Sequence, residues 1–224
     1  MGVNSIALKS GLFMPTATGE VKAIPKMAAG PVVYESLTDA EVMLRAGSDD
    51  TAAFEYLANK YHRPMIAFMY RMCHNQALAE ELAQEVFLRV YRSRQSYAAE
   101  AKFTTWLYRI ATNLAVNYAR DHKVERSGRV VSLDEPDEES GTTLDVSDAS
   151  LNAEQQILRR ERLQAIKKQI LALPEKQRAA VLMHKYDGMD YREIAAVLKL
   201  SESATKSLLF RAYEALRERL KDFV

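Results

Sequence analysis

The chain has 224 residues, of which 48% are hydrophobic and 27% are charged, and its formal net charge at pH 7 is +1. These proportions are typical of a folded globular protein and exclude a disordered or collagen-like chain. A single cysteine, Cys73, excludes an internal disulfide. No apolar run reaches the roughly 18 residues that a membrane span needs, so we expect no membrane insertion. The low content of glycine and proline favours helices.

The first residues of the chain have no regular pattern. Residues 1–35 contain scattered Lys, Pro and Gly, and no apolar stretch followed by a small-residue cleavage site. They therefore do not resemble a secretion signal. We predict that residues 1–35 form a flexible N-terminal extension and that the protein is cytoplasmic.

The net charge is close to zero, but charged residues are distributed unevenly along the chain. Residues 36–123 are balanced, with 11 basic and 10 acidic side chains, whereas residues 124–153 carry 2 basic and 8 acidic ones. Residues 154–224 carry 15 basic and 10 acidic side chains. A basic block behind an acidic connector indicates contact with nucleic acid at the C-terminal end.

Helical signals fill residues 37–123. Thr38 followed by Glu41 matches a capping box, and Pro64 predicts a break or restart in the next helix. Another helix is predicted over about Gln76–Arg94. Apolar residues at spacings of three and four then predict a helix over Phe103–Lys123 with one packed face. Its opposite face carries side chains that can hydrogen-bond: Arg109, Asn113, Asn117 and Arg120.

The next segment, residues 124–153, lacks periodicity and is rich in Asp, Glu, Ser and Thr, which predicts a flexible acidic linker. We therefore predict an all-α fold in which two small helical domains are joined by this linker. In the second domain Pro174 ends the first helix, and Asp187 and Gly188 turn the chain after the second.

The segment Tyr191–Tyr213 has the pattern of a helix-turn-helix. Its first helix spans Tyr191–Leu198, and Ser201 can cap the second. The second helix of such a motif enters the major groove of DNA, and the alternative is a helical hairpin with a solvated polar face. We predict that the exposed residues of this helix contact DNA: Ser203, Lys206, Ser207, Phe210 and Arg211.

Three runs of sequence together resemble the extracytoplasmic-function (ECF) group of bacterial sigma factors. They are Ala79–Tyr91 (AEELAQEVFLRVY), Phe103–Leu114 (FTTWLYRIATNL) and the helix-turn-helix. They occur in the family's order, and the resemblance covers about Leu37 to Leu220. It implies a protein that binds core RNA polymerase, recognises the −10 and −35 promoter elements and assists DNA melting. Residues 36–123 would be sigma domain 2, and residues 154–224 would be sigma domain 4 with its −35 contacts.

The resemblance also implies partners and roles for particular residues. The partners are promoter DNA, core RNA polymerase (the clamp helices of its largest subunit and the flap of the second-largest) and a cognate anti-sigma factor. The Gln76–Arg94 helix resembles the one that docks on the clamp, although any single residue there is also compatible with a solvated helix face. The residues that match the family's contact surface are Glu81, Gln84, Glu85 and Leu88.

The helix Phe103–Lys123 resembles the family's −10-reading element. The resemblance assigns DNA contact to the hydrogen-bonding side chains already named, Arg109, Asn113, Asn117 and Arg120. Trp106 fits stacking on an extruded base, but in this family the matching Trp belongs largely to the core, so we favour packing. For the acidic linker two interpretations stay open, a segment that enters the polymerase channels and an extended spacer.

Two positions depart from the family's pattern. Lys199 stands in the turn where the family usually has Gly, so the backbone there must adopt a strained conformation or another turn geometry. Leu208 stands where the recognition helix often has Arg, which removes a DNA contact and indicates a different preference at the −35 element.

Catalytic and metal-binding functions have no support in the sequence. The four histidines are dispersed, and Cys73 has no partners at metal-ligand spacing. There is no phosphate-binding glycine-rich loop and no nucleophile elbow. We therefore expect a protein that is not an enzyme and that uses no metal or cofactor.

Two other functions fit parts of the pattern. A helix-turn-helix activator with an N-terminal sensor or oligomerisation domain would bind duplex DNA without polymerase. An all-helical adaptor would bind proteins and not DNA, which the basic C-terminal block disfavours. Binding to core polymerase distinguishes the sigma factor from both.

Overall fold

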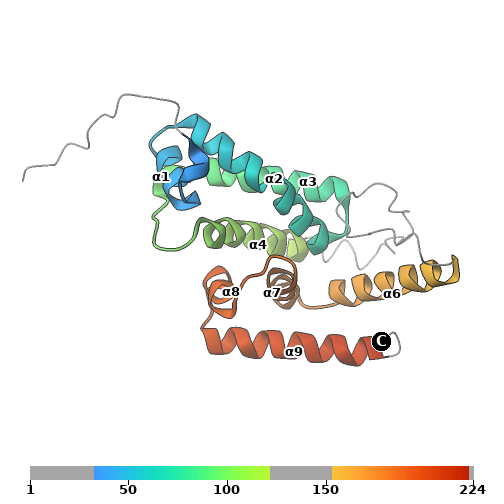
Figure 1. The fold of residues 1–224 in the computed structure, drawn as a ribbon. Coiled ribbons are helices and arrows are strands. Elements are labelled where there is room, and N and C mark those ends of the chain that lie inside the picture. Colours follow the sequence, from blue (N-terminus) through green and yellow to red (C-terminus); the bar gives the residue numbers. More distant parts are fainter. Residues whose placement is uncertain (1–32, 122–152, 222–224) are drawn as a thin grey trace, which may run out of the picture. The chain divides into compact units, whose positions relative to one another are not determined.

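The computed structural model describes residues 33–121 and 153–221 of the chain, and every α-helix or 3-10 helix in Figure 1 falls in these ranges. All the regular elements there are helical, which confirms the predicted all-α class. Residues 124–152 of the predicted acidic linker (residues 124–153) lie outside the described residues, as do residues 1–32 of the predicted extension, and Ala153 is described as the first residue of a helix. At residues 33–35 the chain is described, and the Tyr34 hydroxyl donates a hydrogen bond to Asp50 at 2.9 Å.

The first two long elements are α1 (Asp39–Gly47) and α2 (Thr51–Cys73), preceded by a 3-10 turn at Tyr34–Ser36. The predicted capping box at the start of α1 is confirmed. The Glu41 amide donates to the Thr38 hydroxyl at 3.3 Å, and the Glu41 carboxylate accepts from the Thr38 amide at 2.8 Å. These bonds satisfy amides that the first helical turn leaves without partners.

The predicted break at Pro64 is wrong, because α2 runs without interruption through this residue. Pro64 is exposed, so water can solvate the Lys60 carbonyl, which loses its partner because proline has no amide hydrogen. The buried side chains Leu57, Met65 and Phe68 lie on both sides of Pro64. Packing of this continuous apolar face outweighs the local cost of the proline.

The next two helices are α3 (Gln76–Arg92) and α4 (Phe103–Asp121), with a 3-10 turn at Arg94–Ser96 between them. Asn75 caps α3 by accepting a hydrogen bond from the Leu78 amide at 2.8 Å. In Figure 1, α4 lies between the pair α2 and α3 on one side and α7 and α8 on the other, and it packs against all four.

The C-terminal half contains α6 (Ala153–Leu171), α7 (Glu175–Lys185), α8 (Tyr191–Leu198) and α9 (Glu202–Leu220). The predicted end of the first of these helices before Pro174 is confirmed. The predicted turn after the second is also confirmed, and Gly188 there has φ +65°. Helix α9 packs on α6, α7 and α8, so α8 and α9 are held as a unit by α7.

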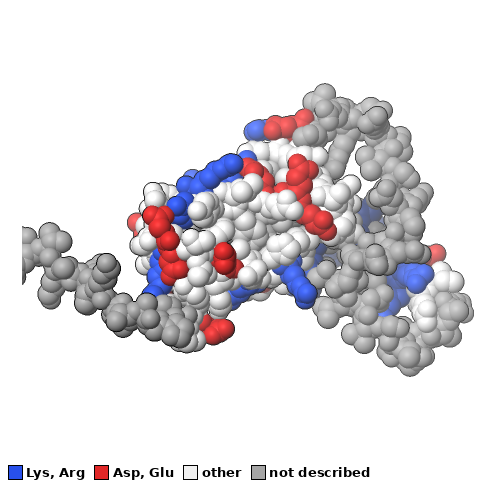
Figure 2. Space-filling model, turned by 90° about the horizontal axis from the view of Figure 1, so that it is seen from above, with Lys and Arg blue, Asp and Glu red and all other residues white. Residues whose placement is uncertain are grey.

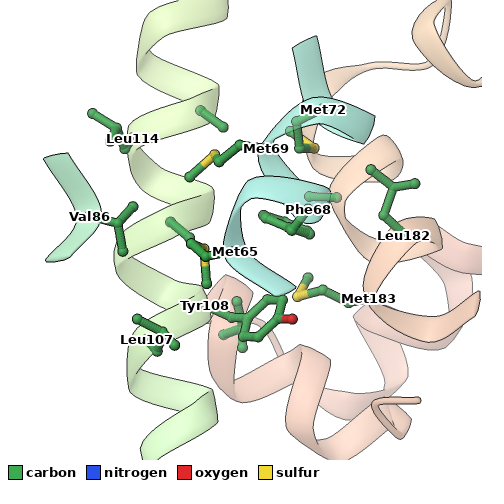
Figure 3. Close-up of a cluster of buried hydrophobic side chains, with 14 of the residues drawn as sticks. Met65, Phe68, Met69, Met72, Val86, Leu107, Tyr108, Leu114, Leu182 and Met183 are labelled. Atoms are coloured by element: carbon green, nitrogen blue, oxygen red, sulfur yellow. The ribbon is translucent and has the colours of Figure 1, made fainter. Parts of the chain in front are cut away.

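One buried core runs through both halves of the described chain. Figure 3 shows Phe68 and Met72 of α2 on the side of Leu182 and Met183 of α7, and Met65 of α2 on the side of α4. Tyr108 of α4 lies in the same cluster, and its ring meets that of Phe68 edge-on with a centroid separation of 5.1 Å. The buried face of α4 therefore meets the N-terminal helices and the C-terminal helices together.

Candidate nucleic-acid interface

The helix-turn-helix forms as the sequence predicts. The α8 helix begins with a capping box between Asp190 and Glu193, and α9 begins at Ser201, whose hydroxyl accepts from the Ala204 amide at 3.1 Å. Between them Lys199 adopts a left-handed conformation, with φ 54° and ψ 48°. Of the two alternatives for this position, the strained backbone is therefore the one observed. It allows the Leu200 amide to donate to the Ala195 carbonyl and closes the turn.

The N-terminal part of α9 presents the predicted DNA-contacting residues to solvent. The buried side chains of Leu209, Ala212 and Leu216 hold its other face on the core. Lys206 forms an ion pair with Glu202 at 2.7 Å, and the Phe210 side chain is 66% exposed. All five predicted residues are exposed: Ser203, Lys206, Ser207, Phe210 and Arg211.

Behind this face lies an aromatic cluster that the sequence analysis missed. His184 of α7 makes a 2.8 Å hydrogen bond through Nδ1 with the Tyr213 hydroxyl of α9, and its ring stacks on Tyr191 of α8 at 5.3 Å. Lys206 lies 5.8 Å from the centre of the Tyr191 ring. The cluster links the three helices and supports the base of the α9 face. No local pattern could have revealed it, because the three aromatic residues belong to different helices.

The hydrogen-bonding face of α4 is divided in two. Asn113, Asn117 and Arg120 are exposed, as expected of DNA contacts. Arg109 is half-buried, and its guanidinium donates to the Ala196 carbonyl of α8 at 2.8 Å. The structure therefore places three of the four predicted residues in solvent and one against the C-terminal helices.

Trp106 packs against the core of the N-terminal helices. Its ring lies 5.0 Å from that of Tyr97 and 6.2 Å from that of Phe103, between centroids. Phe103 is 2% exposed, so this aromatic group is part of the core. The favoured interpretation of Trp106 as a packing residue agrees with this position.

The α3 face predicted to bind polymerase carries acidic, amide and apolar groups side by side. Glu81 and Gln84 are exposed, Glu85 pairs with Arg89 at 2.7 Å, and Leu88 is 49% exposed. Figure 2 looks onto the side of the molecule on which α2 and α3 lie in Figure 1. Acidic and basic side chains alternate there with large uncharged areas, a mixture that suits a protein partner better than a phosphate backbone.

A half-buried acid, which the sequence places only in a turn, lies beside α4. Asp187 accepts a hydrogen bond from the Tyr108 hydroxyl at 2.9 Å. Burial raises the pKa of Asp187 to about 6, although the hydrogen bond from Tyr108 and the nearby Arg71 act in the opposite direction. The two residues are 79 positions apart in the chain, so no spacing rule could have paired them.

No group of three or more His, Cys, Asp or Glu residues in the described ranges is arranged to hold a metal ion. Within the same ranges, no helix has the length and apolar character needed to cross a membrane.

Comparison with known proteins identifies the family. The family model described as Sigma-70 region 2 matches residues 57–125, and Sigma-70 region 4 matches residues 163–216. The RNA polymerase sigma-H factor of Pseudomonas aeruginosa is 30% identical over 187 residues, which cover 82% of this chain and 94% of the relative. The ECF RNA polymerase sigma-E factor of Escherichia coli K12 is 31% identical over 192 residues, 85% of this chain and 98% of the relative.

The chain belongs to the ECF family of RNA polymerase sigma factors. It is therefore a factor that directs RNA polymerase to promoters, and the activator and adaptor alternatives are excluded as its primary function. Region 2 of the sigma factor contains most of α2, all of α3 and all of α4, and region 4 runs from α6 into α9.

Solved structures confirm the fold of this sigma factor. CnrH in complex with the cytosolic domain of CnrY superposes with a TM-score of 0.59 at 18% identity, covering 82% of this chain and 97% of that one. The sigma factor RpoE of Bartonella quintana, in complex with the anti-sigma factor NepR, gives a TM-score of 0.57 at 21% identity, covering 75% and 96%.

Proposed function

We propose that this sigma factor acts by binding alone, with region 2 and region 4 each contributing one DNA-contacting helix and α3 contributing the polymerase contact. In this proposal residues 36–123 form sigma domain 2 and residues 154–224 form sigma domain 4. The observation that carries it is that α4 and α9 belong to the two matched regions and that each exposes amide or basic side chains. Because polymerase and promoters are in the bacterial cytoplasm, we infer that the protein acts there.

The proposed −35 contact is the exposed N-terminal part of α9. Lys206 and Arg211 supply positive charge for phosphates, and Ser203 and Ser207 supply hydroxyls that can donate or accept at base edges. Phe210, 66% exposed, can contact a thymine methyl group. The proposed −10 contact is α4, through Asn113, Asn117, Arg120 and, once it leaves α8, Arg109.

The proposed polymerase contact is the α3 face around Leu88. An exposed leucine flanked by Glu81, Gln84 and Glu85 can anchor apolar contact with a partner helix and pair with its basic side chains. We also propose an anti-sigma factor as a partner, because CnrH and the Bartonella quintana sigma factor were each solved with a bound protein, named in the second case as an anti-sigma factor.

Replacing Leu88 by aspartate tests the polymerase contact. A charge at the centre of the interface must be desolvated, so we expect Leu88→Asp to weaken binding to core RNA polymerase about tenfold or more in a titration with labelled sigma factor. Leu44→Asp is the matched control, since Leu44 is also an exposed helical leucine, 44% exposed against 49% for Leu88. Equal affinity for the two variants would place the contact elsewhere.

A further inference from the structure

The Lys206 ammonium on the exposed face of α9 lies between two other side chains. Its Nζ is 2.7 Å from a carboxylate oxygen of Glu202, one turn earlier on α9, and 5.8 Å from the centre of the Tyr191 ring of α8. The hydrogen bond from Lys206 and its positive charge lower the pKa of Glu202, so this carboxylate stays charged at neutral pH. A cation within about 6 Å of an aromatic ring is attracted to its face. Lys206 therefore has a preferred position although its side chain is exposed.

A lysine needs such partners if its charge is to stay at one place. Its ammonium is carried on a flexible four-carbon stem, and ordering this stem on DNA costs conformational entropy. Contacts that already hold the stem in the free protein reduce this cost. The Lys206 side chain keeps 56% of its exposure, and an ammonium has three donor hydrogens, so it can donate to DNA while it keeps its present neighbours.

The Tyr191 ring is itself held in place by a second aromatic contact. The His184 ring, in the last turn of α7, stacks on it with centroids 5.3 Å apart and planes inclined by 21°. His184 Nδ1 lies 2.8 Å from the Tyr213 hydroxyl of α9. His184 follows the fully buried Met183, and Tyr213 follows the fully buried Ala212, so the backbone at both ends of this hydrogen bond is anchored in the core.

The contact with Tyr191 draws the Lys206 ammonium toward the beginning of α8. Tyr191 is the first residue of α8, and Figure 1 shows α8 next to the N-terminal end of α9, on which it packs. In a helix-turn-helix the first helix crosses the DNA backbone, and the second presents its N-terminal residues to base edges. A cation held beside the first helix therefore lies on the backbone side of the recognition helix, where it can donate to a phosphate.

We propose that Tyr191, held by His184, positions Lys206 for a phosphate of the −35 element. Both aromatic residues act through Lys206 and are positioning residues. The proposal rests on the assignment of α9 to the −35 element under the proposed function. It has two consequences. A change at Tyr191 affects promoter binding only while Lys206 is present, and the size of the effect does not depend on the bases of the −35 element.

A double-mutant cycle in promoter binding by the holoenzyme tests this coupling. The unchanged protein, Tyr191→Leu, Lys206→Ala and the double variant are each titrated onto labelled promoter DNA. We expect Tyr191→Leu alone to weaken binding about threefold, the equivalent of one exposed cation–π contact. In the Lys206→Ala background the same change should weaken binding by less than about 1.5-fold, because no ammonium is left to position.

Two further variants separate the ring from the rest of the contact. Tyr191→Phe keeps the aromatic face and should restore the affinity to within about 1.5-fold of the unchanged protein. His184→Ala removes the stacked ring and should weaken binding about twofold, again only when Lys206 is present, which keeps the test decisive if Tyr191→Leu does not fold. Equal losses for Tyr191→Phe and Tyr191→Leu would assign the effect to the hydroxyl and overturn the proposal.

Nuclear magnetic resonance of the full-length free chain with labelled lysine reports on the position of Lys206 without DNA. An aromatic ring shifts the resonances of protons near its face. The Lys206 ε-methylene signal, identified by its loss in Lys206→Ala, should therefore move in Tyr191→Leu and much less in Tyr191→Phe. A signal that stays in place in Tyr191→Leu would show that the ring does not hold Lys206.

The remaining outcomes separate this proposal from the proposed function. Additive losses in the cycle contradict positioning through Lys206. A coupling that disappears when one −35 base pair is substituted would assign Lys206 to a base and overturn the phosphate assignment. If Lys206→Ala binds promoter DNA as tightly as the unchanged protein, the −35 contact of the proposed function fails at this residue, whereas the resonance of the free chain reports on the Tyr191 contact alone.

Discussion

Replacing Lys206 and Arg211 together by alanine will weaken promoter binding by the polymerase holoenzyme about 10- to 100-fold and make it less dependent on salt. Both side chains are exposed on the N-terminal part of α9, the part of a recognition helix that meets DNA. Each phosphate contact that is lost releases one counterion fewer, so the slope of log affinity against log salt should become less negative by about one unit for each residue.

The measurement is a titration of labelled promoter DNA with holoenzyme over a series of salt concentrations. Arg219→Ala provides the control, because Arg219 is exposed on the same helix but about 12 Å further along its axis than Arg211. This variant should keep the slope of the unchanged protein. Lys206 and Arg211 would not contact DNA if the double variant bound with the same affinity and slope at every salt concentration.

Replacing Phe68 by alanine will lower the free energy of unfolding by about 3–5 kcal/mol, a large part of the stability of a protein of this size. Phe68 is fully buried, contacts Tyr108 edge-on and lies in the cluster shown in Figure 3. Removing the ring leaves a cavity between α2, α4 and α7, which the helices can fill only by shifting toward one another and giving up their present packing.

Urea denaturation followed by circular dichroism measures this effect, and Phe210→Ala is its matched control. The same atoms are removed there from a side chain that is 66% exposed, so stability should change by no more than about 0.5 kcal/mol. Similar losses in the two variants would show that burial at Phe68 does not determine the stability of the core.

The parts of the fold that depend on neighbouring residues could be predicted from the sequence. The capping box at Thr38 and Glu41, the cap at Ser201 and the turn at Lys199 each involve residues within about one helical turn of one another. The exposure of Lys206 and Arg211 follows from the same short-range logic, since helical periodicity alone separates them from the buried Leu209.

The parts that depend on distant residues could not be predicted in this way. Helix α2 continues through Pro64 because the apolar face on either side of this residue is packed against other helices. The free energy gained by this packing is not contained in local helix propensity. The hydrogen bond from Arg109 to the Ala196 carbonyl joins residues 87 positions apart, and the hydrogen bond from Tyr108 to Asp187 joins residues 79 positions apart. Periodicity places Arg109 on a polar face but does not say whether solvent or another helix lies against it.

Run-off transcription with core RNA polymerase on fragmented genomic DNA tests the central claim most directly. With the sigma factor present, the account predicts discrete start sites that share a −35 and a −10 sequence at a fixed spacing and that are absent with core polymerase alone. A transcript profile identical to that of core polymerase alone would contradict the assignment of promoter recognition to this chain.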